Sequence, residues 1–226
     1  MPRIPRSRLL ALTLALGSLS LSVRSLDAQG YRPAPRVELT PFGSYQWGGS
    51  FGTDAFATIP AGKIQEEDSF SWGAILSFSA TGTSAVELLY LRQDTDVSFD
   101  PTIGTQRQLG GFANNYIQIG GRNDFPMGGD GNVRPFISAS IGMNVLDPKA
   151  GDLGSSTRWA WTLGGGARFV PEGQKIGFRF DARWMVTPVP SGSYGGWCDY
   201  WGCYAVEGTS WVGQGQVGLG LIWAFK

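Results

Sequence analysis

Large apolar residues alternate with small or polar residues in eight windows along this 226-residue chain. The windows cover residues 37–47, 70–80, 86–93, 116–122, 135–144, 158–169, 176–185 and 211–225. A period of two is typical of β-strands, because successive side chains of a strand point to opposite faces of its sheet. Strands of about ten residues cross a bilayer when they are tilted. After residue 28 no window holds the roughly eighteen apolar residues of a helical span, so the pattern predicts transmembrane strands.

The two faces of these strands indicate which kind of β-protein they build. One face carries large apolar side chains, with Trp, Tyr and Phe gathered at both strand ends, and the other carries mainly Gly, Ser, Thr and Gln. In a soluble β-sandwich the second face would be solvated and rich in charge. Two aromatic girdles around a small, polar interior are typical of a membrane barrel. We therefore predict one all-β domain, an eight-stranded antiparallel up-and-down transmembrane β-barrel.

The connections between the windows support a closed barrel. Long links (48–67, 95–113, 145–156 and 187–209) alternate strictly with short ones (81–84, 126–133 and 171–175). An even number of strands with both termini in the periplasm produces this alternation, with the long loops on the outside of the cell.

The first 28 residues have the pattern of a cleaved signal peptide. Arg3, Arg6 and Arg8 precede an apolar stretch over residues 9–23, and Ala28 offers the small residue of a cleavage site. The apolar stretch is too short for a spanning helix. We expect an exported chain with a short periplasmic lead at 29–36 and the barrel at 37–226.

Composition removes several classes of function. The chain contains no histidine, 18 Lys and Arg against 18 Asp and Glu, and two cysteines. Without an imidazole, Ser-His-Asp and Cys-His catalysis and His-liganded metal sites are excluded. The formal net charge of the chain is zero, whereas a nucleic-acid-binding protein would show a basic stripe. We therefore expect no catalytic residues, no metal, no cofactor and no nucleic-acid partner.

The segment at residues 86–90 and the carboxy-terminal strand give the chain a family resemblance. The final strand has apolar residues at every second position before an aromatic end: Val217, Leu219, Leu221, Trp223 and Phe225. In these features and in its strand pattern the chain resembles the small eight-stranded outer-membrane barrels of the OmpA/OmpW type, apart from one extra residue, Lys226. The resemblance implies a monomer in the outer membrane, in contact with lipid and lipopolysaccharide, and inserted by the barrel assembly machinery through its last strand.

Charged residues on the small, polar face are candidates for a site inside the barrel. They are Glu38, Glu87 and Asp181, with Arg122, Arg158, Arg168, Arg179 and Arg183. A barrel of eight strands is just wide enough for its side chains, which favours a salt-bridge network, with Glu87 paired to arginines of the fourth and seventh strands. The alternative is a narrow aqueous path, in which the excess of Arg would favour anions.

The last long link holds a second candidate site. Cys198 and Cys203 lie close in sequence in an exported chain, so we expect a disulfide between them. The same link carries five aromatic residues: Tyr194, Trp197, Tyr200, Trp201 and Tyr204. Clustered aromatics favour contact with lipopolysaccharide or a partner surface, or else pack on one another and on the barrel rim.

Two acidic groups, residues 66–68 and Asp94, Asp96 and Asp100, flank the predicted outer rim. Their spacing matches no EF-hand loop, so we expect solvated strand ends rather than a Ca²⁺ site. For function we expect a structural or surface-interaction role with no enzymatic reaction. The alternative is a porin-like channel for small solutes with a weak preference for anions.

Overall fold

The computed structural model describes residues 37–53, 61–125, 127, 132–149, 155–171, 174–189, 198–199, 202–203 and 210–225. The predicted signal peptide, the lead at 29–36 and the aromatic residues Tyr194, Trp197, Tyr200, Trp201 and Tyr204 lie outside these ranges. No helix in the described part of the chain has the length and hydropathy needed to cross a membrane.

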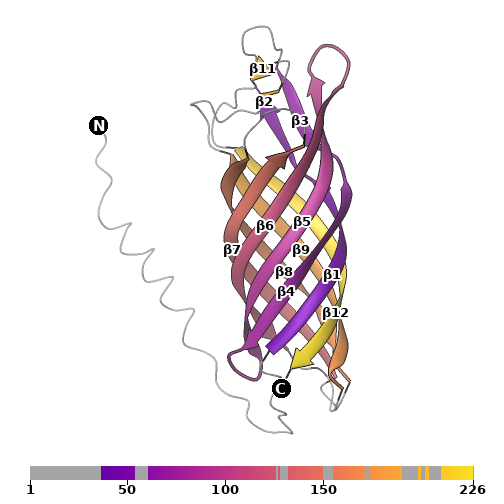
Figure 1. Ribbon diagram of the computed structural model, residues 1–226, viewed down its shortest axis with the longest axis vertical. Coiled ribbons are helices and arrows are strands. Elements are labelled where there is room, and N and C mark those ends of the chain that lie inside the picture. Colours follow the sequence, from indigo (N-terminus) through magenta and orange to yellow (C-terminus); the bar gives the residue numbers. More distant parts are fainter. Residues whose placement is uncertain are drawn as a thin grey trace, which may run out of the picture. The chain divides into compact units, whose positions relative to one another are not determined.

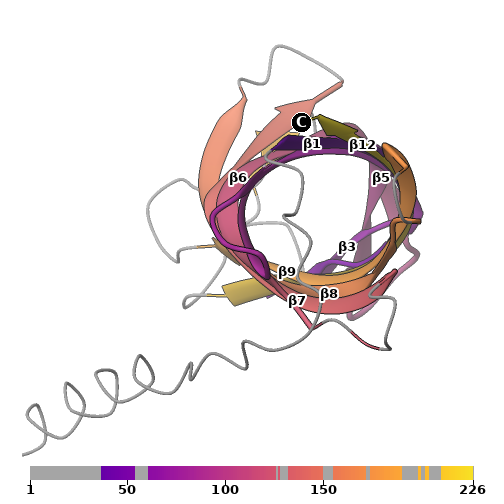
Figure 2. The same ribbon diagram turned by 90° about the horizontal axis from the view of Figure 1, so that it is seen from below.

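Eight strands of the described part form a closed antiparallel β-barrel, as predicted. The wall strands are β1 (Val37–Gly48), β4 (Ser69–Ser79), β5 (Ser84–Pro101), β6 (Arg107–Asp124), β7 (Val133–Pro148), β8 (Ser156–Phe169), β9 (Ile176–Val189) and β12 (Ser210–Phe225). Each pairs with its neighbours along the chain, and β1 closes the ring by pairing with β12 from Val37 opposite Phe225 to Gly48 opposite Gln214. Figure 1 shows the tilted wall and Figure 2 shows the ring from below.

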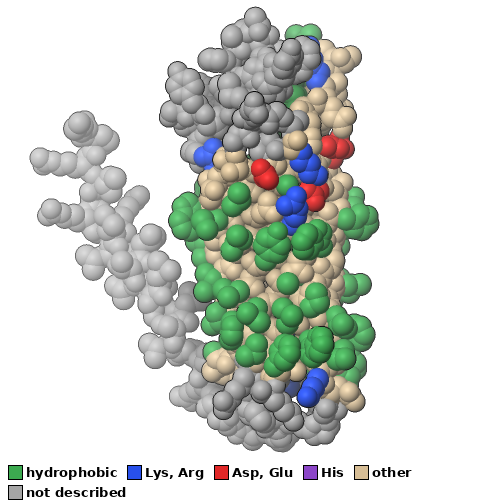
Figure 3. Space-filling model, in the orientation of Figure 1, with side chains coloured by type: hydrophobic (Ala, Val, Ile, Leu, Met, Phe, Trp, Pro, Cys, Tyr) green, Lys and Arg blue, Asp and Glu red, His purple; other side chains and the backbone are tan. Residues whose placement is uncertain are grey.

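The two faces of the wall follow the alternation of the sequence. In β1, for example, Glu38, Thr40 and Phe42 are buried inside, whereas Leu39 and Tyr45 are exposed on the outside. Figure 3 shows outward apolar side chains as a broad band across the face of the wall in view. This band is the surface that an outer-membrane barrel presents to lipid.

Aromatic side chains concentrate near both edges of this band. Near the end of β12, Trp223 stacks on Phe225, with ring centroids 5.9 Å apart. Toward the other edge, Tyr45 meets Phe70 and Trp161 meets Trp211 in edge-to-face contacts. Rings at these two levels match the interfacial girdles of membrane barrels.

The sheet continues further outward than the sequence indicated. The expected link at 95–113 is largely strand, because β5 runs to Pro101 and β6 begins at Arg107. The link at 48–67 contains β2 (Ser50–Thr53) and β3 (Gly62–Glu66), and β3 pairs with the outer end of β5. We call β2, β3 and residues 94–101 and 107–113 the outer sheet. A register shift opposite Val97 and Ser98 leaves Leu109 of β6 without an opposite residue, which interrupts the period of two in β6.

Candidate functional site: the barrel interior

Eight charged side chains fill the lower part of the barrel, near the start of β1 and the end of β12. They are Glu38, Glu87, Asp124 and Asp181, with Arg122, Arg168, Arg179 and Arg183, and we call them the charge layer. All eight are buried. They come from β1, β5, β6, β8 and β9, because the inward positions of these strands reach the same height in the lumen.

Salt bridges join the charge layer into one chain across the interior. Arg168 bonds Glu38 on one side and Asp124 on the other, the latter at 2.9 Å between Nη1 and Oδ2. Arg122 then links Asp124, at 2.8 Å from Nε to Oδ1, to Glu87, at 2.7 Å from Nη1 to Oε1. β8 is not a neighbour of β1 or β6 in the wall, so the Arg168 contacts span the lumen rather than a strand pair.

The chain of bridges continues from Glu87 to the far side of the barrel. Arg179 Nη1 lies 2.6 Å from Glu87 Oε1, and its Nε lies 2.9 Å from Asp181 Oδ2. Asp181 in turn accepts from Arg183 Nη2 at 2.8 Å. The Arg179 guanidinium also stacks 4.4 Å from the ring centroid of Phe136. Each buried charge therefore has partners, as its desolvation requires.

The structure brings together seven of the eight charged residues expected inside the barrel, and Glu87 contacts Arg122 of β6 and Arg179 of β9. Arg158 is the exception: it lies opposite Asn144, is half-buried and forms no ion pair with any described residue. Asp124 also takes part, although it lies beyond the strand window predicted at 116–122. The charge layer thus holds four acids and four arginines, so the expected excess of Arg is wrong for this layer.

Above the charge layer the interior is filled by small polar and apolar side chains. Ser44 and Ser71 bond each other at 2.7 Å, and Gln118 Oε1 accepts from Ser140 and Thr162 at 2.7 and 2.8 Å. Packed among them is an apolar cluster: Phe42, Ile75, Leu89, Leu91, Tyr116, Ala160 and Met185. A cavity of about 20 Å³ lies between these side chains and the charge layer, lined by Ser140 and Thr162 and by Glu87 and Arg183, and it has room for about one water molecule.

A layer of amide side chains crosses the barrel below its mouth. Gln46 Nε2 donates to Gln214 Oε1 at 2.8 Å, and Asn144 Nδ2 donates to Asn114 Oδ1 at 3.2 Å. Gln214 and Asn114 both donate to Glu66 Oε2, the latter at 3.2 Å. Glu66 was expected as a solvated strand end, but it is only partly exposed and faces inward, because it shares the inward side of β3 with Ile64.

An apolar cluster lies at the mouth of the barrel, above the amide layer. Ile64, Val97, Phe99, Phe112 and Val212 are buried against one another, with Leu109 and Leu146 packed around them. The lumen is therefore occupied at each described level, from the charge layer to the outer sheet.

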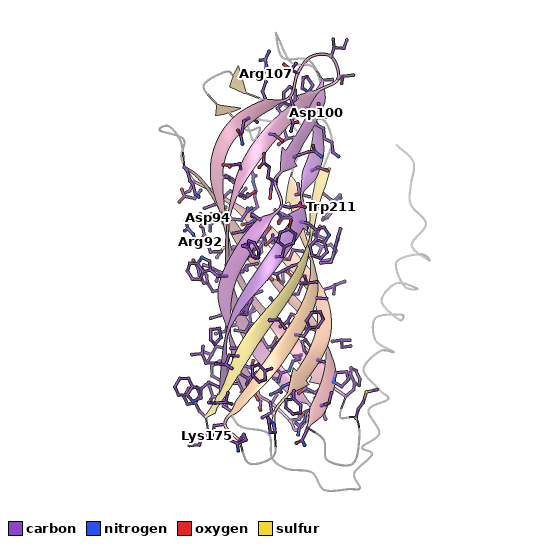
Figure 4. All side chains as sticks on the ribbon, turned by 90° about the vertical axis from the view of Figure 1, so that its right-hand side faces the viewer. Arg92, Asp94, Asp100, Arg107, Lys175 and Trp211 are labelled. Atoms are coloured by element: carbon purple, nitrogen blue, oxygen red, sulfur yellow. The ribbon has the colours of Figure 1, made fainter. Side chains whose placement is uncertain are left out.

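The outer rim carries an exposed ion cluster next to the aromatic girdle. Asp94 pairs with Arg92 and Lys149, each at 3.0 Å, and Figure 4 shows Arg92 and Asp94 side by side on the outer face. The hydrogen bond from Arg92 holds the pKa of the Asp94 carboxyl below its usual value. Within the described ranges, no group of three or more His, Cys, Asp or Glu residues is placed to hold a metal ion.

The two cysteines occupy opposed backbone positions in a short strand pair. β10 (Cys198–Asp199) and β11 (Gly202–Cys203) are antiparallel, with Cys198 directly opposite Cys203. Opposed positions of an antiparallel pair bring the Cβ atoms to about 4.5–5.5 Å. The disulfide stays a prediction, because the side chains of this pair lie outside the described part.

Comparisons with known proteins rest on structure. The sequence matches no family model and has no significant match to a curated protein. OprG from Pseudomonas aeruginosa is similar with a TM-score of 0.57 at 12% identity, over 88% of this chain and 99% of that one. The outer membrane protein AlkL is similar with a TM-score of 0.56 at 13% identity, over 90% of this chain and 96% of that one. Neisserial surface protein A is similar with a TM-score of 0.54 at 12% identity, over 86% of this chain and 100% of that one.

These similarities concern the fold, and the wall itself supplies independent evidence for the membrane. A closed barrel with an apolar band, two aromatic girdles and a polar interior is stable only where its outer face meets lipid. The chain therefore has the fold of the small eight-stranded outer-membrane β-barrels of the OmpA/OmpW type, and its apolar band places it in an outer membrane.

Proposed function

We propose that this protein is a closed, non-conducting barrel with a structural or surface-interaction role and no enzymatic reaction. The charge layer is the observation that carries the proposal. Its bridges connect β1, β5, β6, β8 and β9 through the middle of the lumen, so a solute on this path would have to break buried ion pairs. Breaking one such pair costs about 3–5 kcal/mol.

The balance of charge argues against the anion channel that was the alternative. An anion-selective path needs rings of unpaired Lys or Arg facing water. Here the four arginines of the charge layer are each bonded to a carboxylate, so no net positive potential remains at this level. The apolar cluster at the mouth adds a second barrier on the described path.

The absence of histidine from the sequence supports the non-enzymatic part of the proposal. The common general base of hydrolytic sites is missing, and a Ser or Cys nucleophile needs such a base within hydrogen-bond distance. The surface role is assigned to the last outer link, whose aromatic residues and predicted disulfide suit contact with lipopolysaccharide or another surface. Insertion through the carboxy-terminal strand and a monomeric state belong to the same proposal.

Single-channel conductance tests the proposal. Residues 29–226 are refolded, folding is verified by heat-modifiable gel migration, and the protein is added to a planar bilayer. We expect a silent bilayer. A general diffusion porin added afterwards to the same bilayer controls for insertion and electrode response. Reproducible conductance steps with an anion preference from the folded protein would contradict a closed lumen.

A further inference from the structure

Glu66 joins the outer sheet to the barrel wall at the mouth of the lumen. It ends β3, and its Oε2 accepts from Asn114 of β6 and Gln214 of β12. β6 and β12 are not neighbours in the wall, so this carboxyl ties the outer sheet to two separate parts of the rim. The Glu66 amide nitrogen also donates to Gly49 O, at 2.8 Å.

The turn between β1 and β2 is shaped to cover this carboxyl. Gly49 has φ +95°, a conformation that favours glycine. A Cβ built on Gly49 would lie 3.2 Å from both the Cδ and the Oε2 of Glu66. The backbone of the turn therefore packs directly on the carboxyl, and the close approach depends on glycine.

Glu66 has no cationic partner among its described contacts. The groups that face it are neutral: Gln46 from β1, Gly49 from the turn after β1, Gln93 from β5, Asn114 and the phenol of Tyr116 from β6, and Gln214 from β12. The charged residues near it on its own segment are Lys63, Glu67 and Asp68, all exposed. On β5, Asp94 is bonded to Arg92 and Lys149 on the outer face and Asp96 is exposed.

Two observations indicate that this layer takes up a proton. Burial raises the pKa of the Glu66 carboxyl to about 7, although the hydrogen bond from Asn114 lowers it. The layer is also short of donors, since within the described structure the buried oxygens Gln46 Oε1 and Asn144 Oδ1 accept no hydrogen bond. A protonated carboxyl adds one donor to a layer with surplus acceptors.

We propose that Glu66 is a proton-controlled latch, which in its protonated form holds the outer sheet over the lumen mouth and in its ionised form releases that sheet toward water. The sign follows from desolvation, because the ionised carboxylate gains more from leaving the buried layer than the neutral acid does. The inference concerns the outer sheet alone and is independent of whether the lumen conducts.

Hydrogen–deuterium exchange of residues 29–226 in phosphatidylcholine nanodiscs tests the latch. Wild type is compared with Glu66→Gln at pH 5.5 and pH 8.5, because comparison at one pH cancels the intrinsic dependence of exchange on pH. At pH 5.5 we expect equal exchange. At pH 8.5 peptides covering residues 62–66 and 97–101 of the wild type should exchange at least about tenfold faster than those of Glu66→Gln. Peptides covering residues 86–93 of the wall should not differ.

Glu67→Gln is the matched control, since it removes the neighbouring exposed carboxylate, and it should behave as the wild type does. Equal exchange of wild type and Glu66→Gln at pH 8.5, or the same change in Glu67→Gln, would overturn the proposal. If Glu66→Gln does not fold, carboxyl NMR of the wild type decides. A Glu66 midpoint near 7 supports the latch, and a midpoint near 4.5 refutes it.

Discussion

Replacing Glu87 by Gln removes the central acid of the charge layer without changing its size. Glu87 accepts from Arg122 Nη1 at 2.7 Å, from Arg179 Nη1 and Nη2 at 2.6 and 3.1 Å, and from Ser77 Oγ at 3.0 Å. The neutral amide cannot compensate two guanidinium groups, so the layer carries one uncompensated positive charge. Breaking a buried pair in this way costs about 3–5 kcal/mol. We expect the lower end, about 3 kcal/mol, because Arg179 keeps Asp181.

Urea unfolding in lipid vesicles measures the loss of stability in Glu87→Gln. Tryptophan fluorescence and gel migration give two readouts of the same unfolding transition. Asp94→Asn is the matched control, because Asp94 also pairs with two cations but has a side chain that is 39% exposed. Exposed pairs contribute at most about 1 kcal/mol. The double variant Glu87→Gln with Arg179→Gln restores the balance of charge and should recover part of the loss.

The reasoning would be refuted if Glu87→Gln were no more destabilising than Asp94→Asn. That result would mean that water reaches the charge layer, since solvated charges lose little when a partner is removed. The closed lumen would then also need revision.

Three further outcomes are expected. Gly166→Ala should lower the free energy of unfolding by about 1–3 kcal/mol in the same urea assay, because its Cβ would lie 1.9 Å from a backbone oxygen of β9. Gly43→Ala is the control: a Cβ there would have no atom within 4 Å, so the free energy of unfolding should not change. Mass spectrometry of the unreduced protein should find no free thiol at Cys198 or Cys203, and alkylation without reductant would argue against the bridge. Because the pKa of Glu66 is raised in the folded protein, the contribution of this one carboxyl to stability is fully present below about pH 4.5 and is lost as the pH rises to about 7. Urea midpoints should therefore fall across this range in the wild type and not in Glu66→Gln.

The wall strands were predictable from the sequence because each depends on a local pattern. The resemblance to OmpA/OmpW-type barrels was predictable for the same reason. The side chains of a strand alternate whatever the strand pairs with, so Glu38 could be placed inside and Leu39 outside from the sequence alone. The outer sheet was not predictable in the same way. On β5 Val97 and Phe99 keep the period of two, but on β6 the register shift leaves Leu109 without an opposite residue and moves the positions that follow out of phase.

Which charged side chains meet inside the lumen depends on their height along the barrel axis, and the sequence does not give this height. Arg158 and Arg168 lie ten residues apart on the same inward side of β8, yet Arg168 meets Glu38 and Asp124 while Arg158 lies opposite Asn144. Their heights follow from the stagger of all the strands around the ring. No local pattern distinguishes the two arginines.

Sequence by itself determined the number of wall strands, the face on which the side chains of the eight windows lie and the apolar band that meets lipid, because a period of two and aromatic strand ends are properties of short segments. Only the tertiary structure decided that Asp124 belongs to the charge layer and that Glu66 turns inward beneath Gly49 while Glu67 and Asp68 stay exposed. Contacts between strands that are distant in sequence depend on the register of the whole ring, and register is set by all the strand pairs together.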